Sequence, residues 1–359
     1  MYNVRVVYVE IGENEEGQRL DRFLRKYLGE APLSFIYKAI RKDVKVNGKR
    51  VSRELILNSG DRIDIYITDE KLEELRPKAR STACTKQVKR EFTTVYEDGN
   101  IIAVNKPFGL LTHGDSVEKK HHLANQVVDD LIIRGEFDPK SSKGFTPAPA
   151  NRLDRNTTGI VLFGKNAKAL RDLNRRIRRR DGIRKLYLTI AAGELNERLE
   201  LSGALVKDEE KNRVTVVRGG NAAVRIAAKG DESSRDTKSD AVREIVTIAE
   251  PIKTANGYTL IKVELVTGRS HQIRAHLASA GYPLVGDPKY GDEDINEKIR
   301  NRFGLNWQLL HAWQIEFSHL EDSPLNYLEG RPLCAEPTKR FTEIAKDIFG
   351  DTNFLEIEK

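Results

Sequence analysis

Residues 151–159, Asn-Arg-Leu-Asp-Arg-Asn-Thr-Thr-Gly, form a polar segment that runs directly into the apolar run at 160–163. A short apolar run bounded by a polar turn predicts a buried strand. The polar segment at the mouth of this strand carries one carboxylate, Asp154, between Arg152 and Arg155. Neighbouring cations favour the ionised form of a carboxylate, so Asp154 is a candidate nucleophile or general base. A turn with one solvated aspartate is the alternative interpretation.

A second polar cluster lies at 265–277, Leu-Val-Thr-Gly-Arg-Ser-His-Gln-Ile-Arg-Ala-His-Leu. Apolar and charged residues alternate over 261–265, which predicts a half-buried strand, and apolar residues recur at helical spacing over 273–280. The cluster therefore marks a strand-to-helix turn, where backbone amides and the helix dipole favour anions. Arg269 and Arg274 are candidates to hold phosphates or a catalytic carboxylate. A capped helix with ordinary surface arginines is the alternative.

Together these two clusters resemble the signature motifs of the RluA-type pseudouridine synthases. The family motif around the catalytic aspartate, His-Arg-Leu-Asp-x-x-Thr/Ser-x-Gly, is similar to residues 151–159, with Asn151 in place of the usual histidine. The later family motif, Thr-Gly-Arg-Thr/Ser-His-Gln-Ile/Leu-Arg-x-His, matches residues 267–276. Further similar stretches lie at 104–107, 109–113, 185–187 and 310–312. The resemblance covers residues 93–320.

The resemblance implies an enzyme that isomerises specific uridines to pseudouridine in structured RNA, with 23S large-subunit ribosomal RNA as the expected substrate and transfer RNA as the alternative. It implies that Asp154 is the essential catalytic residue, acting either on the ribose carbon or on a ribose proton. Tyr187 would stack on the target base and transfer a proton. Arg274 would pair with Asp154 and keep it ionised, and Arg269 is the second candidate for that role.

The same resemblance suggests a set of substrate-binding residues around these three. Because the target base must be flipped out of folded RNA, Arg152 is the candidate to occupy the vacated space. Leu310 would pack beneath the uracil, and Arg155 and His271 complete the predicted set. The isomerisation needs no redox step and no group donor, so neither an organic cofactor nor a metal is expected.

The first 70 residues predict a separate small α/β unit. It contains an amphipathic helix at 20–28, a second helix capped by Ser34, an Asn-Gly hairpin at 44–51 and a strand at 63–67. This arrangement resembles the RNA-binding domain named after ribosomal small-subunit protein four, the S4 domain. The candidate RNA-phosphate ligands of this unit are its basic residues Arg19, Arg22, Lys38, Arg41, Lys42 and Lys45. A merely charged outer face is the alternative.

The predicted fold is therefore α+β: an S4-like domain over residues 1–70, a charged linker over 71–92, and a catalytic domain with a mixed, mainly antiparallel sheet over 93–359. Within the catalytic domain we expect a long polar loop at 219–240 and a final helix at 340–349. The segment 171–185 contains eight basic residues on a helix with an apolar stripe, and we expect it to contact the RNA backbone.

Composition bounds the remaining possibilities. A net charge of +7 on 359 residues suits a polyanionic partner. The two cysteines, Cys84 and Cys334, are far apart, and no signal peptide or membrane-spanning run is evident, so a cytoplasmic protein is expected. We also expect a monomer. A non-catalytic ribosome-assembly factor is one rival, but it would not need Asp154, Tyr187 and Arg274 together. A methyltransferase is another, but no glycine-rich nucleotide loop is present.

Overall fold

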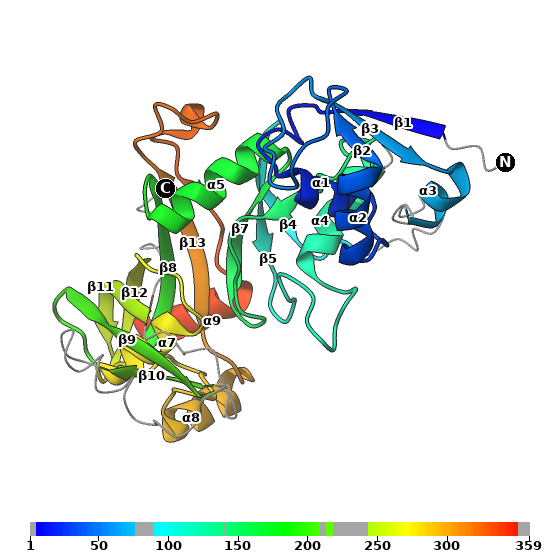
Figure 1. Cartoon of the computed structure of the whole chain (residues 1–359). Helices are drawn as coiled ribbons and strands as arrows, with labels where there is room; N and C mark the ends of the chain where they lie inside the picture. The colour runs from blue at the N-terminus through cyan, green and yellow to red at the C-terminus, as the bar shows by residue number, and fades with distance from the viewer. Residues whose placement is uncertain (1–4, 76–88, 140, 209–212, 218–242, 351–359) are drawn as a thin grey trace, which may run out of the picture.

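The computed structural model describes residues 5–75, 89–139, 141–208, 213–217 and 243–350. Two structural units follow each other along the chain. The second unit contains a long sheet, with β4 and β5 at one end and β9 and β10 at the other. The N-terminal unit, blue in Figure 1, lies beside the end formed by β4 and β5. The predicted loop at 219–240 lies outside the described residues.

The N-terminal unit is a three-stranded antiparallel sheet, in the order β1-β3-β2, packed with helices. Its elements are β1 (Arg5–Glu10), α1 (Leu20–Tyr27), α2 (Leu33–Lys42), β2 (Val44–Val46), β3 (Arg62–Ile67) and α3 (Asp69–Leu75). The predicted Asn-Gly turn is present: Asn47 and Gly48 have φ angles of 52° and 76°, as a two-residue hairpin turn requires. Val46 and Lys49 close it with two backbone hydrogen bonds, although the second arm is only a single bridge.

Two sequence-based expectations for this unit were wrong in detail. Helix α2 begins at Leu33 with Pro32 at the cap position and no side-chain cap, so Ser34 lies inside the first turn. Proline is pre-organised for a helix start because its φ is fixed. The predicted linker also begins too early: Leu72 and Leu75 of α3 are buried in the core of the N-terminal unit. Residues 76–88 of that linker lie outside the described part.

The larger unit contains a mixed, mainly antiparallel sheet, as expected. Its central order is β10-β9-β11-β12-β8-β13-β7-β5-β4, and β6 and β14 pair with β7 and β13. Only the β13–β7 pair is parallel among the described strand pairs. The bounds are β4 (Thr93–Glu97), β5 (Ile101–Lys106), β6 (Ala148–Pro149), β7 (Thr158–Gly164), β8 (Ile183–Ala192), β9 (Leu199–Asp208), β10 (Arg213–Val217), β11 (Arg243–Ala255), β12 (Tyr258–Leu265), β13 (Leu310–Phe317) and β14 (Leu333–Cys334).

Helices cover both faces of this sheet, which explains why β7 is buried at every residue. They are α4 (Leu123–Ile133), α5 (Ala167–Arg179), α7 (Gln272–Ser279), α8 (Glu293–Phe303) and α9 (Lys339–Phe349), with a short 3-10 helix η2 (Asn326–Leu328). Successive strand residues point to opposite faces. Val161 and Phe163 of β7 therefore share a core with α4 and α7, whereas Ile160 and Leu162 pack against α5.

The two units meet at the start of α5. The side-chain oxygen of Asn14 accepts a hydrogen bond of 3.0 Å from the Ala167 amide, and Arg171 donates to the Glu16 carbonyl at 2.7 Å. Lys143 donates to the Glu10 carbonyl at 2.7 Å. The first turns of α5 and the loop that carries Lys143 thus hold the same short segment of the N-terminal unit.

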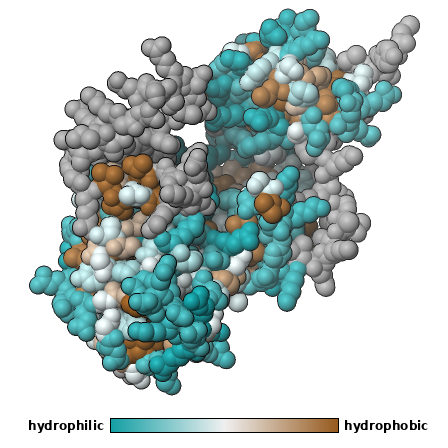
Figure 2. Space-filling view, turned by 90° about the horizontal axis from the view of Figure 1, so that it is seen from below, coloured by the Kyte–Doolittle hydropathy of each residue, from teal (hydrophilic) through white to brown (hydrophobic). Residues whose placement is uncertain are grey.

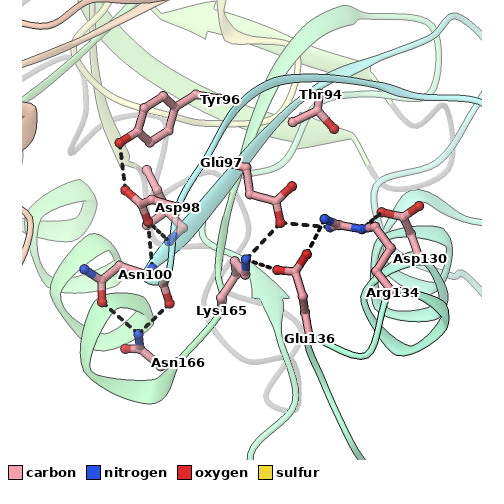
Figure 3. A network of polar contacts seen from close by, with 12 residues as sticks. Thr94, Tyr96, Glu97, Asp98, Asn100, Asp130, Arg134, Glu136, Lys165 and Asn166 are labelled. Atoms are coloured by element: carbon pink, nitrogen blue, oxygen red, sulfur yellow. Dashed lines mark hydrogen bonds and ion pairs between the residues drawn. The ribbon is translucent and has the colours of Figure 1, made fainter.

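A network of charged residues borders this joint (Figure 3). Lys165, immediately before α5, forms ion pairs with Glu97 and Glu136, and Arg134 at the end of α4 joins both of these carboxylates to Asp130. The network connects β4, α4 and the β7–α5 connection. No described helix is both long enough and apolar enough to cross a membrane.

Candidate active site

A cavity of about 270 Å³ lies where several separate segments of the catalytic unit meet. Seven of the eight residues predicted to act on the substrate line it: Arg152, Asp154, Tyr187, Arg269, His271, Arg274 and Leu310. Arg155 is not among the lining residues. Its side chain is 52% exposed and approaches Asp115 at 3.8 Å. These seven residues come from the loop before β7, from β8, from the β12–α7 turn with the start of α7, and from β13. The fold therefore brings together residues more than a hundred positions apart.

The loop that carries Asp154 is anchored by its neighbours. The hydroxyl group of Thr112 accepts a hydrogen bond from the Leu153 amide at 3.1 Å and donates to the Leu153 carbonyl at 3.0 Å. The Thr157 amide donates to the Asp154 carbonyl at 3.1 Å. Leu153 is buried in the core, whereas the Asp154 side chain remains 31% exposed. The carboxylate therefore sits at a fixed position that a ligand in the cavity can reach.

Arg274 is the buried cation nearest to this carboxylate. Its Nη1 atom lies 3.8 Å from Asp154 Oδ2, which is an ion-pair distance but too long for a hydrogen bond. Its Nε and Nη2 atoms each donate to Asp287 at 2.7 Å. Burial alone would lower the pKa of Arg274, but the Asp287 carboxylate outweighs burial and raises it. The guanidinium is thus a permanent positive charge held in place by Asp287.

His271 approaches Asp154 from a second direction. It precedes α7 in a left-handed conformation with φ 57°, and its Nε2 atom lies 3.9 Å from Asp154 Oδ2. Its Nδ1 atom shares a hydrogen bond of 3.1 Å with the Tyr290 hydroxyl. Burial lowers the pKa of His271 although Asp154 opposes the shift, so the imidazole is mainly neutral at neutral pH. Arg274 therefore carries the charge opposite Asp154.

Tyr187 and Leu310 supply the apolar part of the cavity wall. Both are buried, on the adjacent strands β8 and β13, where Tyr187 pairs with Ala312 in the antiparallel register. Burial raises the pKa of the Tyr187 phenol, and the nearby Asp154 carboxylate raises it further. The phenol is therefore protonated at neutral pH and can donate a proton or a hydrogen bond.

Sequence reasoning missed three groups around the site. Asp287 lies in a Gly-Asp-Pro turn after the apolar pair at 284–285, a pattern that predicts a turn but no partner for Arg274. Lys185 lines the cavity, and burial lowers its pKa. Lys106 is fully buried and donates to three backbone carbonyls. Burial lowers the pKa of Lys106 to about 7, and Asp154 opposes this shift. Lysine is seldom fully buried, so the sequence pattern alone gave no reason to expect it.

The predicted RNA-binding residues of the N-terminal unit lie at or near its surface. Arg22, Lys38, Arg41 and Lys42 are exposed. Arg19 forms a bidentate pair with Asp21, at 3.1 and 2.6 Å, and the Lys45 ammonium lies 5.3 Å from the centre of the Tyr66 ring.

The basic helix α5 is less available to RNA than its composition suggests. Arg176 is buried in an ion pair with Asp172, and Arg171 holds the N-terminal unit. Among the described residues, no three His, Cys, Asp or Glu side chains gather into a group that could hold a metal ion.

Comparisons with known proteins agree with this geometry. The family model of RNA pseudouridylate synthase matches residues 100–279. The chain is 33% identical over 318 residues to ribosomal large subunit pseudouridine synthase C of Vibrio parahaemolyticus, and 32% identical over 321 residues to the protein of that name in Escherichia coli K12; each match covers 88% of this chain and 89% of the relative. The solved structure of human RNA pseudouridylate synthase domain containing 4 superposes with a TM-score of 0.53 at 19% identity, over 70% of this chain and 91% of that one. The chain belongs to the RNA pseudouridylate synthase family.

Proposed function

We propose that this protein isomerises uridine to pseudouridine in large-subunit ribosomal RNA, and that Asp154 is its catalytic residue. One observation carries the site assignment: Asp154, Tyr187, Arg274 and Leu310 line a single cavity although the sequence separates them widely. The names of the relatives support the choice of RNA substrate. A non-catalytic assembly factor would have no need for this complete set of groups.

The chemistry explains why these groups belong together. The reaction breaks the bond between ribose C1′ and uracil N1, turns the base, and joins C1′ to C5. The base loses the C5 proton and gains a proton at N1, so atoms balance without a co-substrate. Asp154 either attacks the ribose or removes a ribose proton; both roles require the ionised carboxylate that the Arg274 charge favours.

The remaining residues have separate roles in this scheme. Tyr187 stacks on the uracil and exchanges a proton with it, because its phenol is protonated and faces the cavity. Leu310 packs beneath the base. The exposed Arg152, at the rim of the cavity, replaces the flipped base in the RNA, and the exposed Arg269 contacts phosphate. Action in the cytoplasm and as a monomer stays a prediction.

Pseudouridine mapping in cells tests this proposal. Ribosomal and transfer RNA from cells that lack the protein are compared with RNA from cells that carry the wild type, Asp154→Asn or the exposed control Asp181→Asn. We expect at least one large-subunit site to be lost and to return with the wild type and the control, but not with Asp154→Asn. Loss of a transfer RNA site instead would mean that the substrate is transfer RNA and not ribosomal RNA. Full restoration by Asp154→Asn would exclude Asp154 as the catalytic residue.

A further inference from the structure

Two aromatic rings stack against each other at the surface of the catalytic unit. The centroids of Phe108 and Trp307 are 3.8 Å apart and their planes differ by 25°. Phe108 nevertheless keeps 40% of its surface exposed. Hydrophilic residues dominate the face shown in Figure 2, where hydrophobic residues form small separate patches. An exposed aromatic stack on such a protein is a candidate contact site, because covering the rings would be favourable.

Phe108 is held rigidly next to the catalytic loop. It lies in the turn between Pro107 and Leu110, and the carbonyl groups of both these residues accept hydrogen bonds from the buried Lys106, at 3.0 and 2.7 Å. The third hydrogen bond of Lys106, also 3.0 Å, goes to the carbonyl of Arg155, the residue after the catalytic aspartate. The Lys106 ammonium group thus holds two segments at a fixed distance from each other: the turn that contains Phe108 and the loop that contains Asp154.

Trp307 is fixed to the other side of the same site. Its carbonyl packs against Gly286, where an added Cβ atom would lie only 2.3 Å away, and the next residue, Asp287, holds the catalytic-site arginine. The residue after Trp307, Gln308, is buried, and its side-chain amide donates to the Thr157 hydroxyl at 3.4 Å. The aromatic pair therefore joins the two segments that position the carboxylate and its counter-charge.

Positive charge on the catalytic loop, which Lys106 ties to the Phe108 turn through the Arg155 carbonyl, indicates what the aromatic pair contacts. Arg152 and Arg155, on either side of Asp154, are both exposed. Aromatic rings and guanidinium groups on one surface suit single-stranded RNA, because the rings stack on bases and the positive charges attract phosphates. Flipping of the target uridine also leaves the adjacent bases without a stacking partner.

We propose that Phe108 and Trp307 form a stacking platform for a nucleobase next to the target uridine. This inference rests on the proposed function and identifies the part of the substrate that lies outside the catalytic cavity. The opposing possibility is that the two rings only cover each other and the backbone beneath them.

Tryptophan fluorescence distinguishes these possibilities. The chain has two tryptophans. Trp313 is buried in a core cluster against which the half-buried Trp307 packs, so the conservative change Trp313→Phe in the full chain leaves Trp307 as the only tryptophan reporter. The probe is a single-stranded oligoribonucleotide with one uridine among adenines. A second probe has abasic residues in place of the two adenines beside that uridine, which keeps the phosphates and removes the neighbouring bases. Binding is measured independently by fluorescence anisotropy of a labelled probe.

We expect the adenine probe to quench Trp307, and the abasic probe to quench it weakly. Phe108→Tyr keeps an aromatic ring and should bind like the parent, whereas Phe108→Leu keeps apolar bulk without a ring and should bind the adenine probe about ten-fold more weakly. The abasic probe should not discriminate between the two variants. The salt dependence of binding should be the same in both, because neither substitution removes a charge.

Equal affinities of Phe108→Tyr and Phe108→Leu for the adenine probe, or unchanged Trp307 fluorescence at saturating RNA, would overturn the platform. Neither readout depends on turnover. Pseudouridine formation by the wild type is assayed separately. If the wild type forms pseudouridine but the affinity for RNA does not depend on the aromatic ring at position 108, only the proposed stacking platform is refuted. A protein that forms no pseudouridine refutes the proposed function.

Discussion

Arg274 makes two hydrogen bonds of 2.7 Å to Asp287, and the same guanidinium presents its Nη1 atom 3.8 Å from Asp154. The Asp287 side chain is completely buried and that of Arg274 is 5% exposed. The charge opposite Asp154 is therefore set by a residue that does not line the cavity. Asp287 acts as a positioning residue. Its carboxylate orients the Arg274 guanidinium and offsets the free-energy cost of burying that charge.

Removal of Asp287 should consequently damage both stability and activity. Asp287→Ala leaves the Arg274 charge buried without its main partner, so we expect the free energy of unfolding to fall by about 3–5 kcal/mol. Turnover should fall as well, because the guanidinium loses its fixed orientation. Urea unfolding and single-turnover pseudouridine formation measure the two effects.

A double variant separates these effects. Arg274→Met combined with Asp287→Leu removes both buried charges and should recover much of the stability, but it should remain inactive because Asp154 has lost its counter-charge. Recovery of activity in the double variant would mean that the pair has only a structural role.

Tyr187→Phe tests the proposed proton transfer. The substitution keeps the ring and removes the hydroxyl, so RNA affinity should change little while turnover falls about 100-fold or more. The exposed Tyr8 provides a matched control, and Tyr8→Phe should retain full activity. Unimpaired turnover of Tyr187→Phe would restrict Tyr187 to stacking.

Tyr187 should also affect stability at alkaline pH. Its pKa in the folded chain is raised, chiefly by burial. The unfolded chain therefore loses this proton first, and stability is lost as the pH rises above about 10. Tyr187→Phe should make the alkaline loss of stability shallower than in the wild type. Equal slopes in urea titrations at several pH values would contradict this expectation.

The sequence predicted the residues that line the cavity better than the buried groups that hold them in place. Asp154 and Arg274 were predicted because polar motifs interrupt apolar runs at strand ends, and the family resemblance added Tyr187 and His271. Asp287 and Lys106 act through contacts with distant segments, and such contacts leave no periodic signal. Their burial follows from the tertiary fold, which local patterns do not specify.

The domain boundary failed for a related reason. The segment from residue 71 is rich in charge, which favours a linker, yet Leu72 and Leu75 are one helical turn apart and pack in the N-terminal core. Two apolar residues at helical spacing outweigh the surrounding charges when a core lies within reach. In the same way, Arg171 and Arg176 of α5 make contacts within the protein, with the Glu16 carbonyl and with Asp172, which the basic composition of the helix did not predict.

His311 should make the fold sensitive to acid. It is fully buried, shares a hydrogen bond of 2.7 Å with the Thr158 hydroxyl through Nδ1, and contacts the Ala335 carbonyl at 3.0 Å through Nε2. A carbonyl only accepts, so Nε2 carries the proton and Nδ1 accepts from Thr158 in the neutral ring. Burial lowers the pKa of His311 from 6.5 to about 4.

The unfolded chain therefore binds this proton first as the pH falls, and stability is lost between pH 6.5 and 4. The expected loss is about 3 kcal/mol. His311→Gln should be less stable than the wild type at pH 7 but should lose less on acidification. The exposed control His319→Asn should follow the wild type. If His311→Gln loses as much stability as the wild type over this range, His311 is not the titrating group.

A truncated chain tests the role of the N-terminal unit. Phe92 is buried in the catalytic core, and the Glu91 amide and the Arg90 side chain contact Gln126 and Asp130 of α4. The truncation should therefore start at Lys89 rather than at Thr93. It should fold and still form pseudouridine at high RNA concentration, because every proposed catalytic residue follows that point.

We expect the truncated chain to bind RNA more weakly and with a shallower dependence on salt, because the basic residues at 19–45 no longer displace counterions from phosphates. A full-length variant with Lys38, Arg41 and Lys42 changed to glutamine is the matched control, since it keeps the joint at Asn14 and Glu16 intact. If α2 is the RNA anchor, this variant should show most of the reduction in salt dependence that the truncated chain shows. The slope of log K against log salt concentration should become shallower by about 0.7 for each lost phosphate contact with single-stranded RNA. Binding titrations at several salt concentrations decide the matter. Equal affinities and equal slopes for all three proteins would mean that these cations are a solvated surface and that the catalytic unit alone selects the RNA.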